Sequence, residues 1–436
     1  MAVAHGLARR AILGLVAAAV TTTLPARAAE GEAAEAAQAP LWRSAVQEAG
    51  ITGSVRAGLW SSNRRLDDET GVAVPSAWLR LDRKLGPVGV YVDGFFSRED
   101  ALGNAPRGVN RLREAYLEGR SGDWDFRVGR QIVAWGRTDR LNPTDVITPR
   151  DLSLLAPEID EDRFGALAAK AGWALRPDTS LVMVWVPDFT PNRVALSPRP
   201  GLQVVDVVPD SRRTWAVKLD RSGGAVDWSV SAFDGFDLSG DLSLAAAAPG
   251  LTTLALRHHR LRMLGADVAT TVGANRYAAE VAYARTEDLG GGDFFRKNPF
   301  IYAVAGLEHD FGNTLNLIVQ TFGRHVIGWR DAWEAPPALR PLAVQQAVLS
   351  SQADRFQAGI TARLGRKWLN ETLETELAGS ALLTRTGFSL RPRVMYAASD
   401  NLKLVAGMEW FRGSDRTTFG LLERNRTVFG ELRWIF

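Results

Sequence analysis

Histidine is the side chain best suited to acid–base catalysis near neutral pH, and the histidines of this chain do not assemble a catalytic site. His258 and His259 are neighbours, so on a strand their side chains would point to opposite faces. His309 and His325 stand apart from them. The chain has no G-x-S-x-G, H-E-x-x-H or glycine-rich phosphate motif, no twelve-residue calcium loop and no cysteine. The sequence therefore favours a protein that is not an enzyme and that binds no metal or cofactor.

Charged side chains at alternate positions indicate the chemistry of this chain more clearly than its histidines do. From Phe356 to Leu364, apolar residues alternate with polar residues or glycine. In 402–410, apolar residues at the even positions share one face, and Lys403 and Glu409 lie on the other. This period of two is typical of a strand with one apolar and one polar face. The polar faces of the predicted strands carry charges of both signs, on Arg80, Asp82, Asp93, Glu114, Lys218, Asp220, Arg363, Glu374, Glu376, Arg391, Arg393, Glu409, Glu431 and Arg433.

Two roles fit these charges. If they line an aqueous channel, they bind and select ions or polar solutes. Alternatively they pair across the interior, as Arg363 with Glu374 and Arg391 with Glu409 on the two sides of short turns.

A second group of charges lies in the segment 135–163. Pro143, Pro149 and Pro157 restrict its backbone, which favours a loop with a definite shape. Its candidate functional residues are Arg137, Asp139, Arg140, Asp145, Arg150, Asp151 and Asp162. We expect a constriction loop folded into the pore, with a lid outside the mouth as the alternative.

The arrangement of short and long connections indicates the elements that carry these residues. Short turns near 86–87, 121–123, 177–178, 222–224, 273–275, 312–313, 367 and 400–401 alternate with long polar loops near 61–71, 99–108, 135–163, 188–212, 237–252, 286–298, 329–354 and 414–424, and with one short outer connection at 385–387. This predicts an all-β fold, a transmembrane antiparallel up-and-down β-barrel of about eighteen strands, or about sixteen, with short periplasmic turns and long extracellular loops. Such a barrel is too wide for side chains to fill.

The N-terminus predicts export. Arg9 and Arg10 precede the apolar run 11–20, and Ala26-Arg27-Ala28 fits a signal-peptidase site, so we expect a signal peptide over 1–28 and Ala29 as the first mature residue. An N-terminal membrane anchor is the alternative. Residues 29–50 should form a periplasmic leader, either a short helix or disordered, and 51–436 the barrel.

Loss of the signal peptide also changes the charge balance. The whole chain has 52 Lys+Arg and 49 Asp+Glu, and loss of Arg9, Arg10 and Arg27 leaves 49 of each. This balance gives no support for a nucleic-acid partner.

Aromatic residues point to the outer membrane. We expect Trp60, Trp124, Trp135, Trp173, Trp215, Trp410 and Trp434 to form girdles at the membrane surfaces. The last strand alternates apolar residues up to Trp434 and Phe436, which resembles the signal that the barrel assembly machinery recognises. Expected partners are therefore outer-membrane lipids, lipopolysaccharide and that machinery.

The segment Val128-Gly129-Arg130-Gln131, followed by Trp135-Gly136-Arg137 and Asn142-Pro143, resembles Gram-negative outer-membrane barrels of the porin and alginate-export type. In general porins, a loop at about this place folds into the pore and sets its size. Alginate exporters have an arginine-rich, anion-selective lumen, whereas the charges here are balanced.

Three functions fit this sequence. The first is an outer-membrane channel that passes polar or charged solutes. The second is an export conduit for a polysaccharide that works with periplasmic export components. The third is a non-conducting structural or assembly barrel, and measurement of conductance separates it from the other two.

Overall fold

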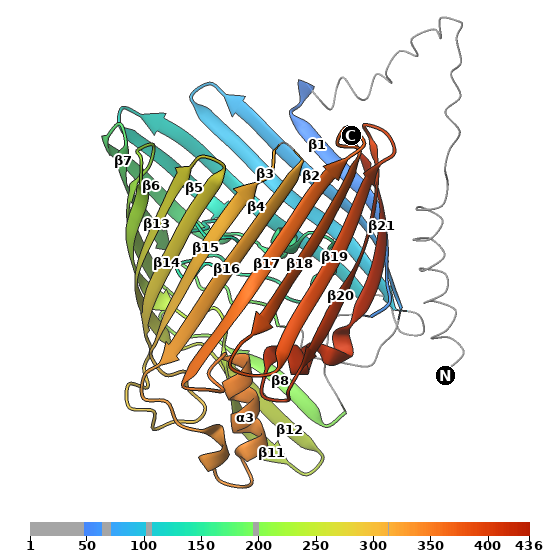
Figure 1. Ribbon diagram of the computed structural model, residues 1–436. Helices are drawn as coiled ribbons and strands as arrows, with labels where there is room; N and C mark the ends of the chain where they lie inside the picture. The colour runs from blue at the N-terminus through green and yellow to red at the C-terminus, as the bar shows by residue number, and fades with distance from the viewer. Residues whose placement is uncertain (1–47, 63–70, 102–106, 195–199, 313) are drawn as a thin grey trace, which may run out of the picture.

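The chain folds into a closed antiparallel barrel (Figure 1). This computed structural model describes residues 48–62, 71–101, 107–194, 200–312 and 314–436. Within them, eighteen strands form one sheet in which each strand pairs with the next barrel strand along the chain. The last strand pairs with the first, from Ser54 opposite Ile435 to Trp60 opposite Phe429, and this pairing closes the sheet.

The barrel strands are β1 Ile51–Trp60, β2 Val72–Leu85, β3 Val88–Ala101, β4 Arg107–Ser121, β5 Trp124–Gln131, β6 Ala166–Arg176, β7 Thr179–Val186, β9 Thr214–Arg221, β10 Asp227–Phe236, β13 Arg260–Val272, β14 Asn275–Arg285, β15 Phe300–Asp310, β16 Leu315–Val326, β17 Phe356–Trp368, β18 Leu373–Leu382, β19 Gly387–Ala397, β20 Leu402–Gly413 and β21 Thr427–Ile435. This confirms the predicted fold class and strand number. The expected signal peptide over 1–28 and most of the leader lie outside the described residues.

Short turns join the strands at one end of the barrel and long loops at the other, as the sequence predicts. One turn was misplaced. Lys367 belongs to β17, and the chain reverses at 369–372, where Leu369, Asn370 and Glu371 all have positive φ. The reversal contains no glycine, and Asn370 is the one residue in it of a type that favours positive φ, so the local signal for a left-handed turn is weak.

The long loops contain further structure at the end opposite the C-terminus (Figure 1). The loop expected over 188–212 contains β8 Leu202–Val207, and the loop expected over 237–252 contains β11 Asp241–Ala248. The second loop is longer than expected, because β12 Leu251–Arg257 extends past residue 252 and forms a separate three-stranded sheet with β8 and β11. The loop near 329–354 contains η2 Ala332–Glu334 and α3 Arg340–Leu349, and the last loop contains α4 Thr418–Leu421 and η3 Leu422–Asn425. None of the helices in the described ranges has the length and apolar character needed to cross a bilayer.

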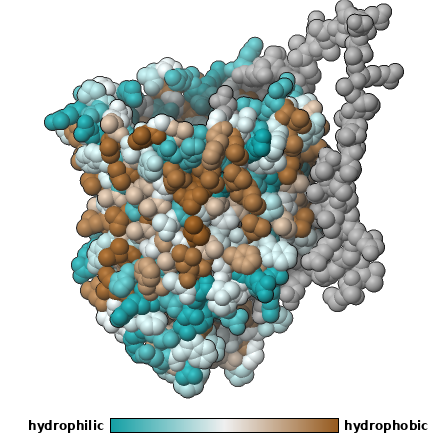
Figure 2. Space-filling view, in the orientation of Figure 1, coloured by the Kyte–Doolittle hydropathy of each residue, from teal (hydrophilic) through white to brown (hydrophobic). Residues whose placement is uncertain are grey.

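An apolar belt covers the outer face of the barrel that Figure 2 shows, between polar rims. Its exposed members include Val55, Phe96, Val128, Leu264 and Ile360. They alternate along the strands with inward residues such as Arg56, Asp93 and Arg363. An apolar outer band of this kind is the surface that a membrane barrel presents to lipid.

The predicted aromatic girdles are partly wrong. Trp173, Trp215 and Trp410 are exposed on the outer face. Trp60, by contrast, is buried inside and stacks on Phe429, with 4.3 Å between ring centroids. Trp135 is also buried, in a core that the long loop forms with the inner wall. Position near a strand end does not tell which face a residue occupies.

Candidate functional site

The segment 132–165, which joins β5 to β6 and is called the lumen loop below, contacts the inner wall around much of the barrel. It contains one helical turn, η1 Ile159–Asp162. A glycine at each end allows close backbone approach: a Cβ at Gly129 would overlap the carbonyl of Ala115, and a Cβ at Gly165 would lie 2.7 Å from the oxygen of Arg113. The V-G-R-Q sequence thus fits the end of β5 closely against β4.

Glu280 of β14 anchors the first part of the lumen loop. Its carboxylate is almost fully buried and accepts hydrogen bonds from the backbone N–H of Arg137 at 2.5 Å and of Thr138 at 2.7 Å. The side chains of Thr138, Asn142 and Thr144 also donate to it. Gly136 has φ 103°, and a Cβ there would lie 2.5 and 2.6 Å from the two carboxylate oxygens. Only glycine leaves room for this acceptor.

Glu280→Ala should release this part of the lumen loop. The substitution leaves two buried backbone donors without their acceptor, at a cost of roughly 1–3 kcal/mol each. We expect the amides of Arg137 and Thr138 to exchange hydrogen much faster than in the parent chain, while the barrel strands stay protected. Hydrogen exchange followed by mass spectrometry measures this. Glu308→Ala, on the neighbouring strand β15, is the matched control, and equal exchange in both variants would contradict the anchoring role.

The tip of the lumen loop reaches strands on the far side of the barrel. Asp139 accepts two hydrogen bonds from Arg363 of β17, at 2.8 and 3.0 Å. Next to it, Arg140 lies 3.3 Å from Glu376 of β18 and adopts φ 63°. Arg363 also lies 3.6 Å from Glu376. We call Asp139, Arg140, Arg363 and Glu376 the charge quartet; two of its members come from the loop and two from the wall.

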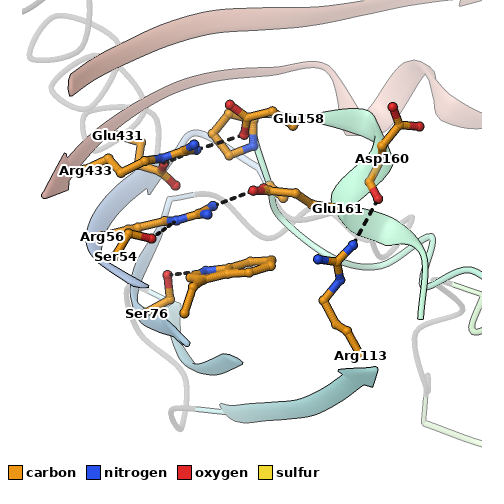
Figure 3. Close-up of polar contacts among 12 residues, drawn as sticks. Ser54, Arg56, Ser76, Arg113, Glu158, Asp160, Glu161, Glu431 and Arg433 are labelled. Carbon is orange, nitrogen blue, oxygen red and sulfur yellow. Dashed lines mark hydrogen bonds and ion pairs between the residues drawn. The ribbon is translucent and has the colours of Figure 1, made fainter. Parts of the chain in front are cut away.

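The second half of the lumen loop is bound at the seam where the barrel closes (Figure 3). Glu161 pairs with Arg56 of β1 at 2.7 Å, and Glu158 pairs with Arg433 of β21 at 2.8 Å. From β4, Arg113 donates to the backbone oxygen of Asp160 at 3.4 Å. One turn of the loop thus bridges the first, fourth and last strands.

Glu161 should make this attachment depend on pH. Burial raises its pKa to about 7, against the opposing effect of Arg56; Glu158 adds to the rise, and Arg433 opposes it. Because the pKa of Glu161 is raised in the folded chain, its carboxyl contributes its full stabilisation only below pH 4.5, the ordinary pKa. This contribution is lost as the pH rises through about 7.

We therefore expect the temperature of the unfolding midpoint to decrease as the pH is raised from about 5 to about 8. Glu161→Gln should make this decrease smaller. Scanning calorimetry in detergent would measure it. Glu118→Gln, at an exposed acid of β4, controls for general charge loss. An equal pH response in the parent chain and in Glu161→Gln would refute the assignment.

Apolar residues of the lumen loop fill one side of the interior. Val133, Trp135 and Ile147 form a buried core with inward residues of β6, β7, β9, β10, β13 and β14. Leu154 and Leu155 pack against the inner face near β1 to β4, β20 and β21. The lumen loop therefore fills this side of the barrel interior with apolar contacts.

Among the residues that the structure describes, two cavities lie on the other side. One, of about 450 Å³, lies toward the short turns and is lined by β15 to β19, including Glu308, Glu374 and Lys367. The other, of about 340 Å³, lies between the lumen loop and β16 to β20 and includes Leu141 and Phe411. Arg363 lines both cavities, so the charge quartet lies between them.

The structure brings several of the predicted residues together. Arg363, Glu376, Asp139 and Arg140 form the quartet, Arg393 pairs with Glu158 at 3.3 Å, and Arg391 pairs with Glu409 at 3.1 Å. Arg137 pairs with Asp220, which also contacts Lys218. Glu114 accepts the N–H of Ile132, and Asp151 pairs with Arg111.

Other predicted residues lie apart from the quartet. Asp145 is buried inside the lumen loop between Arg150 and Arg163, and Asp162 also pairs with Arg150. Arg80 lies 4.0 Å from Asp93. Asp82 is exposed near the turn that ends β2. The expected pair of Arg363 with Glu374 does not form, because the register places Glu374 opposite Lys367.

Comparison with known proteins supports the fold. Residues 62–202 match a family model described as "Protein of unknown function (DUF1302)". Comparison with curated protein sequences gives no match. The similar crystal structures include three that match over most of both chains.

The first is OccD3 (OpdP) of Pseudomonas aeruginosa, with TM-score 0.51, 10% identity and coverage of 89% of this chain and 91% of that one. The second is a BenF-like porin of Pseudomonas fluorescens Pf-5, with TM-score 0.51, 10% identity and coverage of 89% and 97%. The third is OpdK of Pseudomonas aeruginosa with vanillate, with TM-score 0.52, 8% identity and coverage of 88% and 98%. At this identity the three structures show that the chain has a porin fold.

Proposed function

We propose that this chain is an outer-membrane channel that passes small polar solutes along an off-centre path beside the lumen loop. The observation that carries the proposal is the position of the charge quartet between two cavities that share Arg363. The path runs along β15 to β20, since the core around Trp135 fills the opposite side. The apolar outer belt and the porin fold support a place in the outer membrane.

The lumen loop sets the width of this path in the proposed channel. Its tip makes ion pairs with β17 and β18, and its second half is bound at the closing seam. Attachment at both places holds the loop across the interior. Purified protein in planar lipid bilayers should therefore give discrete single-channel currents. A complete lack of current would overturn the proposal and favour a non-conducting barrel.

Selectivity should follow the fixed charges beside the path. Arg391 and Arg393 neutralise Glu409, Glu376 and Glu158, so their replacement by Ser leaves these acids in excess. Fixed charge raises the local concentration of ions of opposite sign. We expect the reversal potential in a salt gradient to shift toward cation selectivity.

Arg83→Ser, at the outer face of β2 near its end, is the control and should leave the reversal potential unchanged. The same reversal potential in the double variant and the parent chain would place Arg391 and Arg393 away from the conducting path.

A further inference from the structure

A row of uncharged polar side chains crosses the wall of the 340 Å³ cavity at one level. The strand register aligns Thr361 of β17 with Ser380 of β18, and Ser380 with Ser389 of β19. The hydroxyls of Ser380 and Ser389 lie 2.8 Å apart. Ser389 is in turn aligned with Phe411 of β20, and Thr361 with Gln320 of β16. We call Thr361, Ser380 and Ser389 the hydroxyl row.

The other walls of this cavity combine apolar side chains with paired charges. Leu141 and Ile159 of the lumen loop contribute apolar surface. The charged groups that line it already have partners of opposite sign: Asp139 with Arg363, Arg140 with Glu376, and Arg391 with Glu409. A solute ion would have to displace one of these charged side chains from its partner. The displaced charge would then have no counter-charge, which costs free energy in a partly buried site.

A sugar hydroxyl avoids this cost. It both donates and accepts hydrogen bonds, so it can accept from a guanidinium while donating to the neighbouring carboxylate, and both ions stay paired. Asp139 beside Arg363 offers such an acceptor and donor together, and the hydroxyl row adds further groups of both kinds. Phe411 and Leu141 provide apolar contacts for the C–H surface of a ring. A volume of about 340 Å³ is also within the range of small-ligand pockets, roughly 300–1,000 Å³.

We propose that this cavity is a binding site for a neutral polyhydroxylated solute, such as a monosaccharide or polyol. This inference rests on the proposed channel function, because the cavity lies on the path.

The test uses glucose, the anion gluconate and the cation glucosamine as probes of similar size. Equilibrium dialysis with labelled probes and purified barrel in detergent measures binding, and interruption of salt current in bilayers measures blocking. Glucose should bind and block at lower concentration than either charged probe. The double variant Ser380→Ala/Ser389→Ala should bind glucose about tenfold more weakly, since hydrogen bonds are lost.

Thr321→Ala is the matched control, because Thr321 pairs with Ile360 on the outer face and should not affect glucose. Normal salt current without glucose binding would overturn the site while leaving the channel function intact. Preference for gluconate, or equal glucose affinity in the double variant, would also overturn it. Glucose binding without any current would support the site and reject the channel.

Discussion

Shortening the lumen loop between Asp139 and Asp162 should raise the single-channel conductance several-fold. The shortened chain loses the tip residues of the charge quartet, the acidic turn at the seam and the apolar residues packed against β1 to β4. A barrel of eighteen strands then regains much of the width that its side chains cannot fill. Single-channel recording in planar bilayers measures the change.

A graded series of variants tests whether the quartet is the narrowest point. Asp139→Ala/Arg140→Ala removes only the loop's half of the quartet and should join the two cavities, with a smaller increase than the deletion. Removal of the outer hairpin tip between Leu244 and Leu251, which belongs to the separate sheet, is the control and should leave conductance unchanged. Barrel yield should be the same in all three variants. Unchanged conductance in the deletion would show that the loop does not limit the current.

Alternating hydrophobicity made the barrel predictable. A slip of one residue would turn every inward charge of a strand toward lipid, so the sequence of a membrane strand specifies its faces strongly. The outer sheet lacks this constraint. β8 pairs with β12 in parallel across about fifty residues, and β11 ends in four exposed alanines, so local sequence predicts neither strand.

The lumen loop shows where prediction of the site stopped. Its length, prolines and charges identified it, but the partners of those charges depend on distances that only the closed barrel sets. Arg140 meets Glu376 from 236 positions away. Two signals were available and were missed. Val133, Trp135 and Ile147 are too apolar for a loop in water, and Glu280 is a lone acid between Ala278 and Ala282 on an inward face.

Deletion of Phe436 should nearly abolish the assembled barrel. The backbone N–H of Phe436 donates to the oxygen of Gly53, and that of Gly53 donates to the oxygen of Phe436, both at 3.0 Å. These bonds continue the register that closes β21 onto β1. The Phe436 ring covers Gly53, where a Cβ would lie 2.7 Å from it. Without this residue, two backbone groups of β1 lose their partners where strands face lipid, which membrane barrels do not tolerate.

Two further variants separate closure of the seam from recognition of the aromatic ring. Phe436→Ala keeps the backbone bonds but removes the ring, which lies 5.4 Å from that of Trp434. If the assembly machinery recognises the ring, Phe436→Ala should assemble poorly in cells yet refold in detergent, whereas the deletion should fail in both. Removal of residues 29–45 is the control and should leave the amount of folded barrel in the outer-membrane fraction unchanged. Equal yields of the Phe436 deletion and this control would contradict both roles of Phe436.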